Sequence, residues 1–524
     1  MAVVSRSLFN IGAGLLSARA STRLKRGANA AAAQDKVFAG LIPKLAGGAT
    51  WKYLGVEAGM KYAEFRSQVP LQTYQSLDRD IERMRTGEAD VLWPGACQIY
   101  ATTSGTAGGS PRYIPVTEAM LAHFRYAGLN SVLWYAVRAG NSRVFRGRHL
   151  QVGGSTALTP IPESAPFEAY AGELSGIAAL NLPGWVEKHL HEPGAEVAQI
   201  ADWDQKVAAV TERTMGLDIS LVSGLPGWIL DQARSLRERS GGGTLKEIWP
   251  HLECCVHSGV PLAPYHDKLA RALGGGVNFH EVYVTSEGFV AAQDEDAAAG
   301  LRVMADAGIF FEFLPMSVYE ESRVPDLGSK AVPLSGVAVG VDYALIMTAP
   351  SGLARYVVGD VVRFVSLSPA RLTYSGRTGL RLNAFGENVS EREVTDALVG
   401  VCQRNGWTIT NFHVAPIFSR STMGRVTGRH EWWVELEAGT LITPTGPIIA
   451  PEVDAEIKRV NKDYDVKRSS GALEAPFVRL VMPGVFEHWM RYHKKWGGQH
   501  KMPRCSSDRK IADELGAALQ FAKD

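Results

Sequence analysis

The segment Thr102–Arg112 reads Thr-Thr-Ser-Gly-Thr-Ala-Gly-Gly-Ser-Pro-Arg. It lies between an expected strand, Ile99 to Thr103, and an expected helix, Thr117 to Arg138. Glycines let the backbone approach an anion closely, and hydroxyl side chains can join backbone N–H groups around phosphate oxygens. The order G-x-x-x-x-G-K-[ST] of a P-loop is absent. Taken alone, the segment indicates either a phosphate-binding loop or a plain surface loop.

Two later stretches place polar side chains on strand-like sequence. Tyr283 to Gly288 ends a strand with an aromatic ring, two hydroxyls and a carboxylate, which suit a purine base and Mg²⁺. The simpler interpretation is a strand-to-turn junction. In Arg355 to Val362, Asp360 follows a glycine inside an apolar strand pattern, where ribose hydroxyls would satisfy a buried carboxylate. The alternative is a turn aspartate between two strands.

Near the end of the sequence, Gly497 to Arg504 places Lys501 in a glycine-led loop. An ammonium group there could meet the negative charge that builds on an α-phosphate and a carboxylate during transfer. The alternative is a solvated basic loop.

Strand-like and helix-like patterns alternate from about Val91 onward, which indicates a mixed α/β domain with βαβ-type units. Strands are expected at Leu252 to Val256 and Glu281 to Thr285, with a helix at Pro264 to Leu273 between them. The pattern changes around Thr373 to Arg381. We therefore expect a large N-terminal α/β domain, residues 1–375, joined by a hinge to a smaller C-terminal domain, residues 376–524.

The C-terminal part again alternates helix-like and strand-like segments. Helices are expected at Ser390 to Val401 and Glu452 to Asn461, and strands at Glu431 to Leu436 and Val478 to Val481. This mixture is typical of a small α+β domain.

The composition indicates a folded protein whose partners are small molecules. Of 524 residues, 46% are hydrophobic and 21% are charged, which is ordinary globular usage. The chain has 55 Lys and Arg residues and 54 Asp and Glu residues, so its charges nearly balance. No overall electrostatic field would therefore attract nucleic acid. No apolar run is long enough for a membrane span. The thirteen histidines show no convincing metal spacing.

The five cysteines are scattered without C-x-x-C spacing, which argues against a disulfide framework or a zinc cluster and fits a reducing cytoplasm. They are Cys97, Cys254, Cys255, Cys402 and Cys505.

The first 33 residues are basic, free of acidic residues and rich in Ala and Ser, as organelle transit peptides are. The favoured interpretation is an N-terminal amphipathic helix, because Leu8, Ile11, Leu15 and Leu16 recur at roughly helical spacing.

The order of these motifs resembles that of the adenylate-forming superfamily. More closely, the chain resembles the plant auxin-responsive acyl acid amido synthetases and their bacterial relatives. The likeness runs from FRSQVPLQTYQSLDRDIERMRTGEADVLWPG, Phe65 to Gly95, through LVSGLPGWILDQARSL and WPHLECCVHSGVPLAPY to HKMPRC. It therefore covers nearly the whole chain.

The resemblance implies an adenylate-forming fold and an ATP-dependent, Mg²⁺-requiring ligase that joins a carboxylic acid to an amine, an amino acid, through an acyl-adenylate. It also implies roles for residues. Tyr283, with Ser258 and Gly259, would border adenine. Glu287 would hold Mg²⁺, Asp360 would bind ribose and Lys501 would serve adenylation. Further positions complete the set: Ser104, Gly105, Thr106, Gly108 and Gly109 for phosphates, Thr285 and Ser286 at the nucleotide, and Arg377 at the hinge.

Two positions depart from the family pattern. Arg112 stands where the first motif often ends in lysine, and keeps the charge. Asn388 follows Gly386-Glu387 where a lysine is common, so the positive charge is not kept there. Two alternatives stay open: transfer of the acyl group to a thiol such as coenzyme A, and a catalytically silent nucleotide-binding relative.

The sequence gives little indication of which carboxylic acid is the substrate. Four aromatic residues on the helix after the phosphate segment either line an apolar pocket or belong to the hydrophobic core, and the core is the favoured interpretation. They are Phe124, Tyr126, Trp134 and Tyr135.

Overall fold

The computed structural model describes residues 6–25, 29–103, 112–420, 426–437, 444–493, 495–496 and 502–521. The chain divides into two compact units. The N-terminal unit comprises Met1–Val260 and Lys268–Thr373, and the C-terminal unit comprises Pro261–Asp267 and Tyr374–Asp524. The single boundary between residues 375 and 376 stays a prediction.

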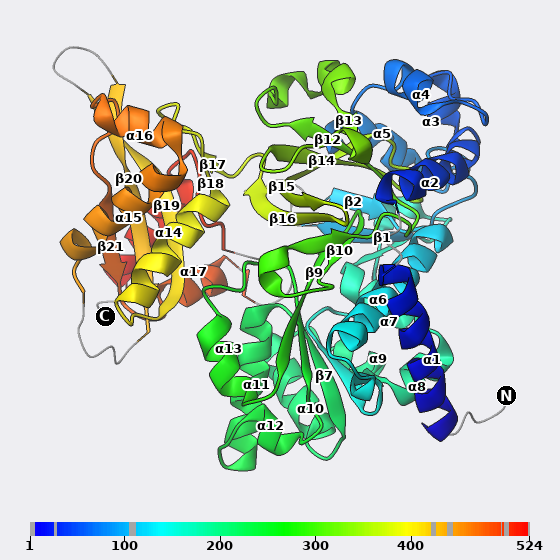
Figure 1. Ribbon diagram of the computed structural model, residues 1–524, viewed down its shortest axis with the longest axis horizontal. Coiled ribbons are helices and arrows are strands. Elements are labelled where there is room, and N and C mark those ends of the chain that lie inside the picture. The colour runs from blue at the N-terminus through cyan, green and yellow to red at the C-terminus, as the bar shows by residue number, and fades with distance from the viewer. Residues whose placement is uncertain are drawn as a thin grey trace. The chain divides into compact units, whose positions relative to one another are not determined.

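The strands in the first part of the chain form two sheets (Figure 1). The larger, 12-stranded sheet runs β13 (Val332–Pro333), β12 (Phe310–Pro315), β14 (Asp342–Thr348), β15 (Tyr356–Leu367), β16 (Ala370–Arg377), β11 (Leu301–Val303), β10 (Gly288–Ala292), β9 (Asn278–Thr285), β8 (Cys254–His257), β7 (Ile219–Gly224), β3 (Arg148–Val152) and β6 (His191–Glu192). The smaller sheet runs β2 (Arg112–Pro115), β1 (Ile99–Thr103), β5 (Tyr170–Gly172) and β4 (Thr159–Pro160).

Helices pack around these strands. They are α1 (Arg6–Lys25), α2 (Ala30–Leu45), α3 (Ala49–Tyr53), α4 (Tyr62–Gln68), α5 (Tyr74–Arg85), α6 (Glu118–Arg138), α7 (Leu174–Leu180), α8 (Gly184–His189), α9 (Ala195–Ala198), α10 (Trp203–Thr214), α11 (Pro226–Ser240), α12 (Leu245–Ile248) and α13 (His266–Leu273).

The large sheet has a parallel half and an antiparallel half. Strands β3, β7, β8 and β9 pair in parallel, and α11 packs against β3 and β7. The expected βαβ alternation is thus confirmed there, because parallel neighbours need a crossover connection. Strands β9 to β11, β11 with β16, and β12 to β15 pair antiparallel. All five residues of β10 are buried, as suits a strand covered on both faces.

Helix α6 confirms the helix expected after the phosphate segment. The hydroxyl of Thr117 accepts a hydrogen bond from the Met120 N–H at 3.1 Å, so Thr117 is the N-cap. Phe124, Trp134 and Tyr135 are buried, which confirms the core interpretation for these three aromatics. Tyr126 is 37% exposed, and its hydroxyl accepts a hydrogen bond from Arg23 at 2.8 Å.

The expected N-terminal helix is confirmed as α1, but Leu15 and Leu16 do not belong to its buried side, and the side chains of Leu8 and Ile11 lie outside the described residues. Leu15 and Leu16 are 63% and 42% exposed, whereas Ala13 and Ala20 are buried in one cluster with Leu133 of α6. Small alanine side chains let two helices approach closely, so contact with α6 outweighs the burial of the larger leucines.

The C-terminal unit is a small α+β structure, as expected. Its elements are β17 (Arg381–Leu382), β18 (Val389–Ser390), α14 (Glu391–Arg404), β19 (Ile409–Arg420), β20 (Val426–Leu436), α15 (Gly446–Val460), α16 (Lys462–Ser469), β21 (Phe477–Val481), α17 (Val485–Tyr492) and α18 (Lys510–Phe521). Strands β19, β20 and β21 form one sheet.

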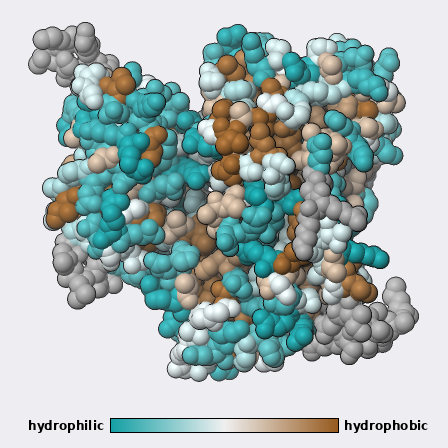
Figure 2. Space-filling model, viewed as in Figure 1, coloured by the Kyte–Doolittle hydropathy of each residue, from teal (hydrophilic) through white to brown (hydrophobic). Residues whose placement is uncertain are grey.

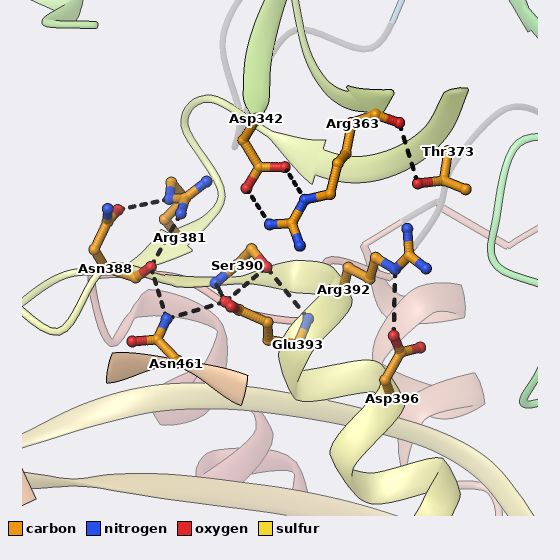
Figure 3. A network of polar contacts seen from close by, with 10 residues as sticks. All are labelled: Asp342, Arg363, Thr373, Arg381, Asn388, Ser390, Arg392, Glu393, Asp396 and Asn461. Carbon is orange, nitrogen blue, oxygen red and sulfur yellow. Dashed lines mark hydrogen bonds and ion pairs between the residues drawn. The ribbon is translucent and has the colours of Figure 1, made fainter. Parts of the chain in front are cut away.

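The start of α14 shows why this sequence forms a helix there (Figure 3). The Glu393 N–H donates to the hydroxyl of Ser390, and the Glu393 carboxylate accepts from the Ser390 N–H at 2.8 Å. This reciprocal pair is a capping box. The side-chain amide of Asn461 donates to the same carboxylate at 3.2 Å, which ties the start of α14 to α16.

The surface is mixed in polarity. Figure 2 shows hydrophobic side chains gathered over the part of the sheet formed by β12, β14 and β15. All five cysteines are buried free thiols. No helix in the described part of the chain is both long and apolar enough to span a membrane.

Candidate functional site

The carboxyl ends of the parallel strands meet at one edge of the large sheet. Val152 of β3 pairs with Gly224 of β7, Gly224 pairs with His257 of β8, and His257 pairs with Glu281 of β9. Ligands of open α/β sheets bind outside such an edge. Ser258 and Gly259 follow β8 directly, so these two predicted residues lie at that edge.

The predicted motif on β9 continues beyond this edge. Tyr283 and Thr285 belong to the strand, and Ser286 with Glu287 forms the turn into β10. The hydroxyl of Thr285 accepts a hydrogen bond from the Glu287 N–H at 3.2 Å. Glu287 is only 7% exposed. The motif is therefore an ordered hairpin turn that carries a nearly buried carboxylate.

Asp360 lies in an irregular part of β15. The partners of Val361 and Val357 on β14 are Ala344 and Ile346, so the longer stretch of β15 bulges between these pairs. A bulge redirects side chains and often accompanies functional sites. Gly359, at φ +91°, supplies backbone that other residues rarely adopt. The alternative of a turn aspartate between two strands is wrong, because β15 is one continuous strand.

Tyr283 and Asp360, which are 77 positions apart, meet through their side chains. The Tyr283 hydroxyl donates a hydrogen bond to Oδ2 of Asp360 at 2.7 Å. Both residues are buried, with 8% and 6% exposure. The structure therefore brings together two residues that the sequence assigned to one nucleotide site.

His123 is a member of this site that the sequence did not indicate. Its Nε2 accepts a hydrogen bond from the Phe289 N–H at 2.9 Å, and its Nδ1 lies 2.5 Å from the Ala307 carbonyl. Burial lowers the pKa of His123 to about 4, so the ring is neutral near pH 7 and can accept at Nε2. His123 thus fixes the backbone next to Glu287 from a distant helix, which no local pattern reveals.

Gly288 shows how closely this turn is packed. A Cβ atom there would lie 2.1 Å from Cδ1 of Ile309 and 3.6 Å from Nε2 of His123. A larger residue between Glu287 and Phe289 would therefore displace the end of the Ile309 side chain.

A second missed element is the loop after β3. Gly153 has φ +111°, and a Cβ atom there would lie 2.0 Å from the Trp228 ring. The ammonium group of Lys206 donates to the Gly154 carbonyl at 3.1 Å. Burial lowers the pKa of Lys206. The only sequence signal for this loop is a pair of glycines after a short apolar strand.

Two predicted positions belong to the C-terminal unit. Arg377 ends β16 and pairs with Leu380 through an isolated antiparallel bridge. Asn388 has φ +47°, a conformation that asparagine tolerates better than most residues. Arg381 donates to the Asn388 side chain at 2.7 Å, as Figure 3 shows. A guanidinium group therefore lies beside this position, although residue 388 is neutral.

Other predicted site residues fall outside the described residues. These are the phosphate-contact residues Ser104, Gly105, Thr106, Gly108 and Gly109, and the adenylation residue Lys501. Arg112 is described and begins β2, paired with Thr103 of β1. Within the described residues no cluster of three His, Cys, Asp or Glu side chains could hold a metal ion.

Solved structures place this fold in a known class. The chain superimposes on an acyl acid amido synthetase, AtGH3.15 in complex with 2,4-DB, with a TM-score of 0.75 at 17% identity over 96% of each chain. It also superimposes on a 2-hydroxyisobutyryl-CoA ligase in the postadenylation state, with a TM-score of 0.57 at 15% identity, covering 95% of this chain and 93% of that one. The fold is that of the adenylate-forming enzymes.

Sequence comparisons identify the family. Residues 24–279, 302–377 and 392–510 match the N-terminal, central and C-terminal domains of the GH3 family. The chain belongs to the GH3 family. It is 23% identical to a probable indole-3-acetic acid-amido synthetase of Oryza sativa subsp. japonica, covering 95% of this chain and 94% of the relative. It is 24% identical to an indole-3-acetic acid-amido synthetase of Oryza sativa subsp. indica, covering 94% and 91%.

Proposed function

We propose that this protein is an ATP-dependent ligase that activates a carboxylic acid as an acyl-adenylate and transfers the acyl group to an amino acid. The observation that carries the proposal is the hydrogen bond between Tyr283 and Asp360 at the edge of an adenylate-forming fold. Membership of a family whose matched relatives are named amido synthetases supports the choice of an amine acceptor.

In this proposal ATP lies across the carboxyl edge of the sheet. Asp360 accepts hydrogen bonds from the ribose hydroxyls. The Tyr283 hydroxyl, 2.7 Å from Oδ2 of Asp360, holds the Asp360 carboxylate in place. Adenine lies beside Tyr283, bordered by Ser258 and Gly259. Thr285 and Ser286 face the nucleotide from the turn, and the segment 104–109 receives the phosphates.

The residues present fit a Mg²⁺ ion that is bound mainly by the nucleotide. Mg²⁺ in such sites takes one or two carboxylates and completes its shell with phosphate oxygens and water. Glu287 supplies one nearly buried carboxylate, whose turn is fixed by Thr285 and by the contact of His123 with Phe289. Such an ion would neutralise phosphate charge when it is bound.

The reaction then has two balanced steps. The substrate carboxylate attacks the α-phosphorus of ATP, a P–O bond forms, and the bond to the β-phosphate breaks to release pyrophosphate. Lys501 stabilises the negative charge on the transferring group. Next, the amine attacks the acyl carbon, loses a proton and displaces AMP, so an amide forms. The C-terminal domain, residues 376–524 with its hinge at Arg377, reorients between the steps and excludes water.

Removal of the Tyr283 hydroxyl tests the proposed seat of the ribose. Tyr283→Phe is expected to weaken ATP binding by about tenfold, because Asp360 loses a charge-assisted hydrogen bond that orients it. Tyr343→Phe is the matched control: Tyr343 is also buried, and its hydroxyl accepts the Ala338 N–H at 2.9 Å. Calorimetric titration with ATP should show a loss in the first variant alone. Equal affinities in both variants would show that the hydrogen bond from Tyr283 to Asp360 contributes nothing to ATP binding.

The product of the reaction identifies which compound accepts the acyl group. The purified protein is incubated with ATP, Mg²⁺, a pool of aryl, indolyl and fatty acids, and either mixed amino acids or coenzyme A, and the products are resolved by mass spectrometry. The proposal predicts amides. A thioester without amides would replace the amine by a thiol, and nucleotide binding without any product would indicate a silent relative.

The five buried free thiols agree with a reducing compartment, and we assign the reaction to the cytoplasm.

A further inference from the structure

Two arginines lie where the chain passes from β1 to β2, and neither forms an ion pair with an acidic side chain among the described residues. Arg85 ends α5, and Arg112 begins β2 opposite Thr103. Nε of Arg85 is fully buried, and no described residue accepts a hydrogen bond from it. A guanidinium group is always charged and carries five donors, so a buried donor without a partner indicates a missing acceptor.

Aromatic rings hold these two arginines in place. The Arg85 guanidinium lies 4.4 Å from the centre of the Tyr113 ring, and the Arg112 guanidinium lies 5.5 Å from the centre of the Tyr74 ring. The Tyr113 N–H donates to the Tyr74 hydroxyl at 3.0 Å, which links the two rings. Burial raises the pKa of Tyr74, the Tyr113 N–H and the charge of Arg85 oppose this shift, and the Asp78 carboxylate beside Tyr74 adds to it.

A neighbouring arginine on the same helix shows the ordinary arrangement. Arg83 bonds Asp80 at 2.7 Å and Glu88 at 2.5 Å, and its side chain is 41% exposed. Its charge is satisfied within the protein. Arg85, two residues later, is turned instead toward β2 and retains donors for another anion.

Phosphate groups suit two such cations best. Guanidinium groups match phosphate oxygens in geometry and are weakly hydrated, and stacking on aromatic rings orders them before the ligand binds. Arg112 ends the hydroxyl- and glycine-rich segment that the family resemblance assigns to phosphates. Tyr283 and Asp360, assigned to the nucleoside, belong to the other sheet. Arg112 thus connects the pair of arginines to the expected phosphate end of the ligand rather than to its nucleoside.

We infer that Arg85 and Arg112 together bind the β- and γ-phosphates of ATP, which leave as pyrophosphate. This inference rests on the proposed function, since it assigns binding residues to the triphosphate of the ATP in the proposed reaction. Arg85 is the residue it adds, because nothing in its local sequence, Arg83 to Gly87, marks a phosphate site.

The test compares ligands that differ only in these phosphates. Calorimetric titrations of Mg²⁺-ATP, AMP and inorganic pyrophosphate are made on the full chain and on Arg85→Met, Arg85→Lys and Arg83→Met. In Arg85→Met the affinities for ATP and pyrophosphate fall at least about tenfold, because a charge-assisted contact is lost, while AMP binds within about twofold. Arg85→Lys recovers part of the loss, and Arg83→Met binds all three ligands like the wild type.

A purely structural Arg85, which only anchors α5 to Tyr113, gives a different result. The variant would lose thermal stability, and its affinities for ATP and AMP would stay unchanged or fall equally. Either of these outcomes overturns the inference. If Arg85→Met does not fold, the ratio of ATP to AMP affinity in Arg85→Lys decides.

The outcome is separable from that of the proposed function. A protein that forms no acyl-adenylate but loses pyrophosphate affinity in Arg85→Met keeps this anion site and loses the proposed reaction. A protein that forms acyl-adenylate with equal affinities in all variants keeps the reaction and loses the role of Arg85.

Discussion

Lys501→Ala is expected to lower the rate of acyl-adenylate formation by about 10²–10³-fold, while the affinity for ATP changes by less than about threefold. A cation that meets charge developing on the α-phosphate acts in the transition state more than in the bound ground state. Its loss therefore affects the rate constant of adenylation and not substrate binding. Single-turnover assays of adenylate formation measure the rate, and calorimetric titration measures ATP affinity.

Lys495 is the matched control for this variant. It lies six positions earlier, and its ammonium group is 5.2 Å from the centre of the Trp489 ring, a contact within the C-terminal unit. Lys495→Ala should leave the adenylation rate unchanged. If Lys501→Ala lowers ATP binding and adenylation equally, Lys501 contributes to binding and has no special part in the chemical step.

Arg355→Met is expected to lower the free energy of unfolding by about 3–5 kcal/mol. Arg355 and Glu312 are a fully buried ion pair, with 0% and 1% side-chain exposure and an N–O distance of 2.8 Å. Arg355 also donates to the carbonyls of Arg66, Val69 and Gly328, and the Tyr62 hydroxyl donates to Glu312. Burial and the neighbouring carboxylate raise the pKa of Tyr62. Without Arg355, the charge of Glu312 is left buried and unpaired.

The control for this prediction is an arginine of β15, the strand that Arg355 precedes. Arg363 pairs with Asp342 at 2.7 Å (Figure 3), but its side chain is 43% exposed. Arg363→Met should cost less than about 1 kcal/mol, because exposed ion pairs contribute little. Urea unfolding followed by tryptophan fluorescence compares the two variants. Equal losses would show that the buried pair is no more important than the exposed one.

This buried pair also supports the candidate site. Arg355 has φ +48° and immediately precedes β15, which carries Asp360 five residues later. The Arg355 N–H donates to the Thr348 hydroxyl at 3.0 Å, so side chain and backbone are both fixed. An unstable ion pair would therefore allow the bulged part of β15 to shift. We expect ATP affinity to fall together with stability in Arg355→Met.

Elements with a strong local pattern could be predicted from the sequence. The bounds expected for Ile99 to Thr103 agree with β1, and the helix expected at Thr117 to Arg138 differs from α6 only at its capping residue. In both cases the signal, an apolar run or a capping hydroxyl before helical periodicity, is contained in neighbouring residues.

Features that depend on distant contacts could not be predicted. The bulge that redirects Asp360 arises from the pairing of β14 with β15, and His123 reaches Phe289 across 166 positions. The buried side of α1 likewise carries Ala13 and Ala20, which pack with Leu133 of α6, and not Leu15 and Leu16. The candidate residues could be proposed one by one from sequence, but their mutual contacts required the fold.

The most direct test of the account is exchange of labelled pyrophosphate into ATP, measured with pooled aryl, indolyl and fatty acids at several Mg²⁺ concentrations. The account predicts exchange that requires an acid and Mg²⁺ and is lost in Glu287→Ala, whose carboxylate is nearly buried in the turn after β9. Acid-dependent exchange that is unchanged in Glu287→Ala would remove this residue from the site. ATP binding without exchange for any acid pool would contradict acyl-adenylate formation itself.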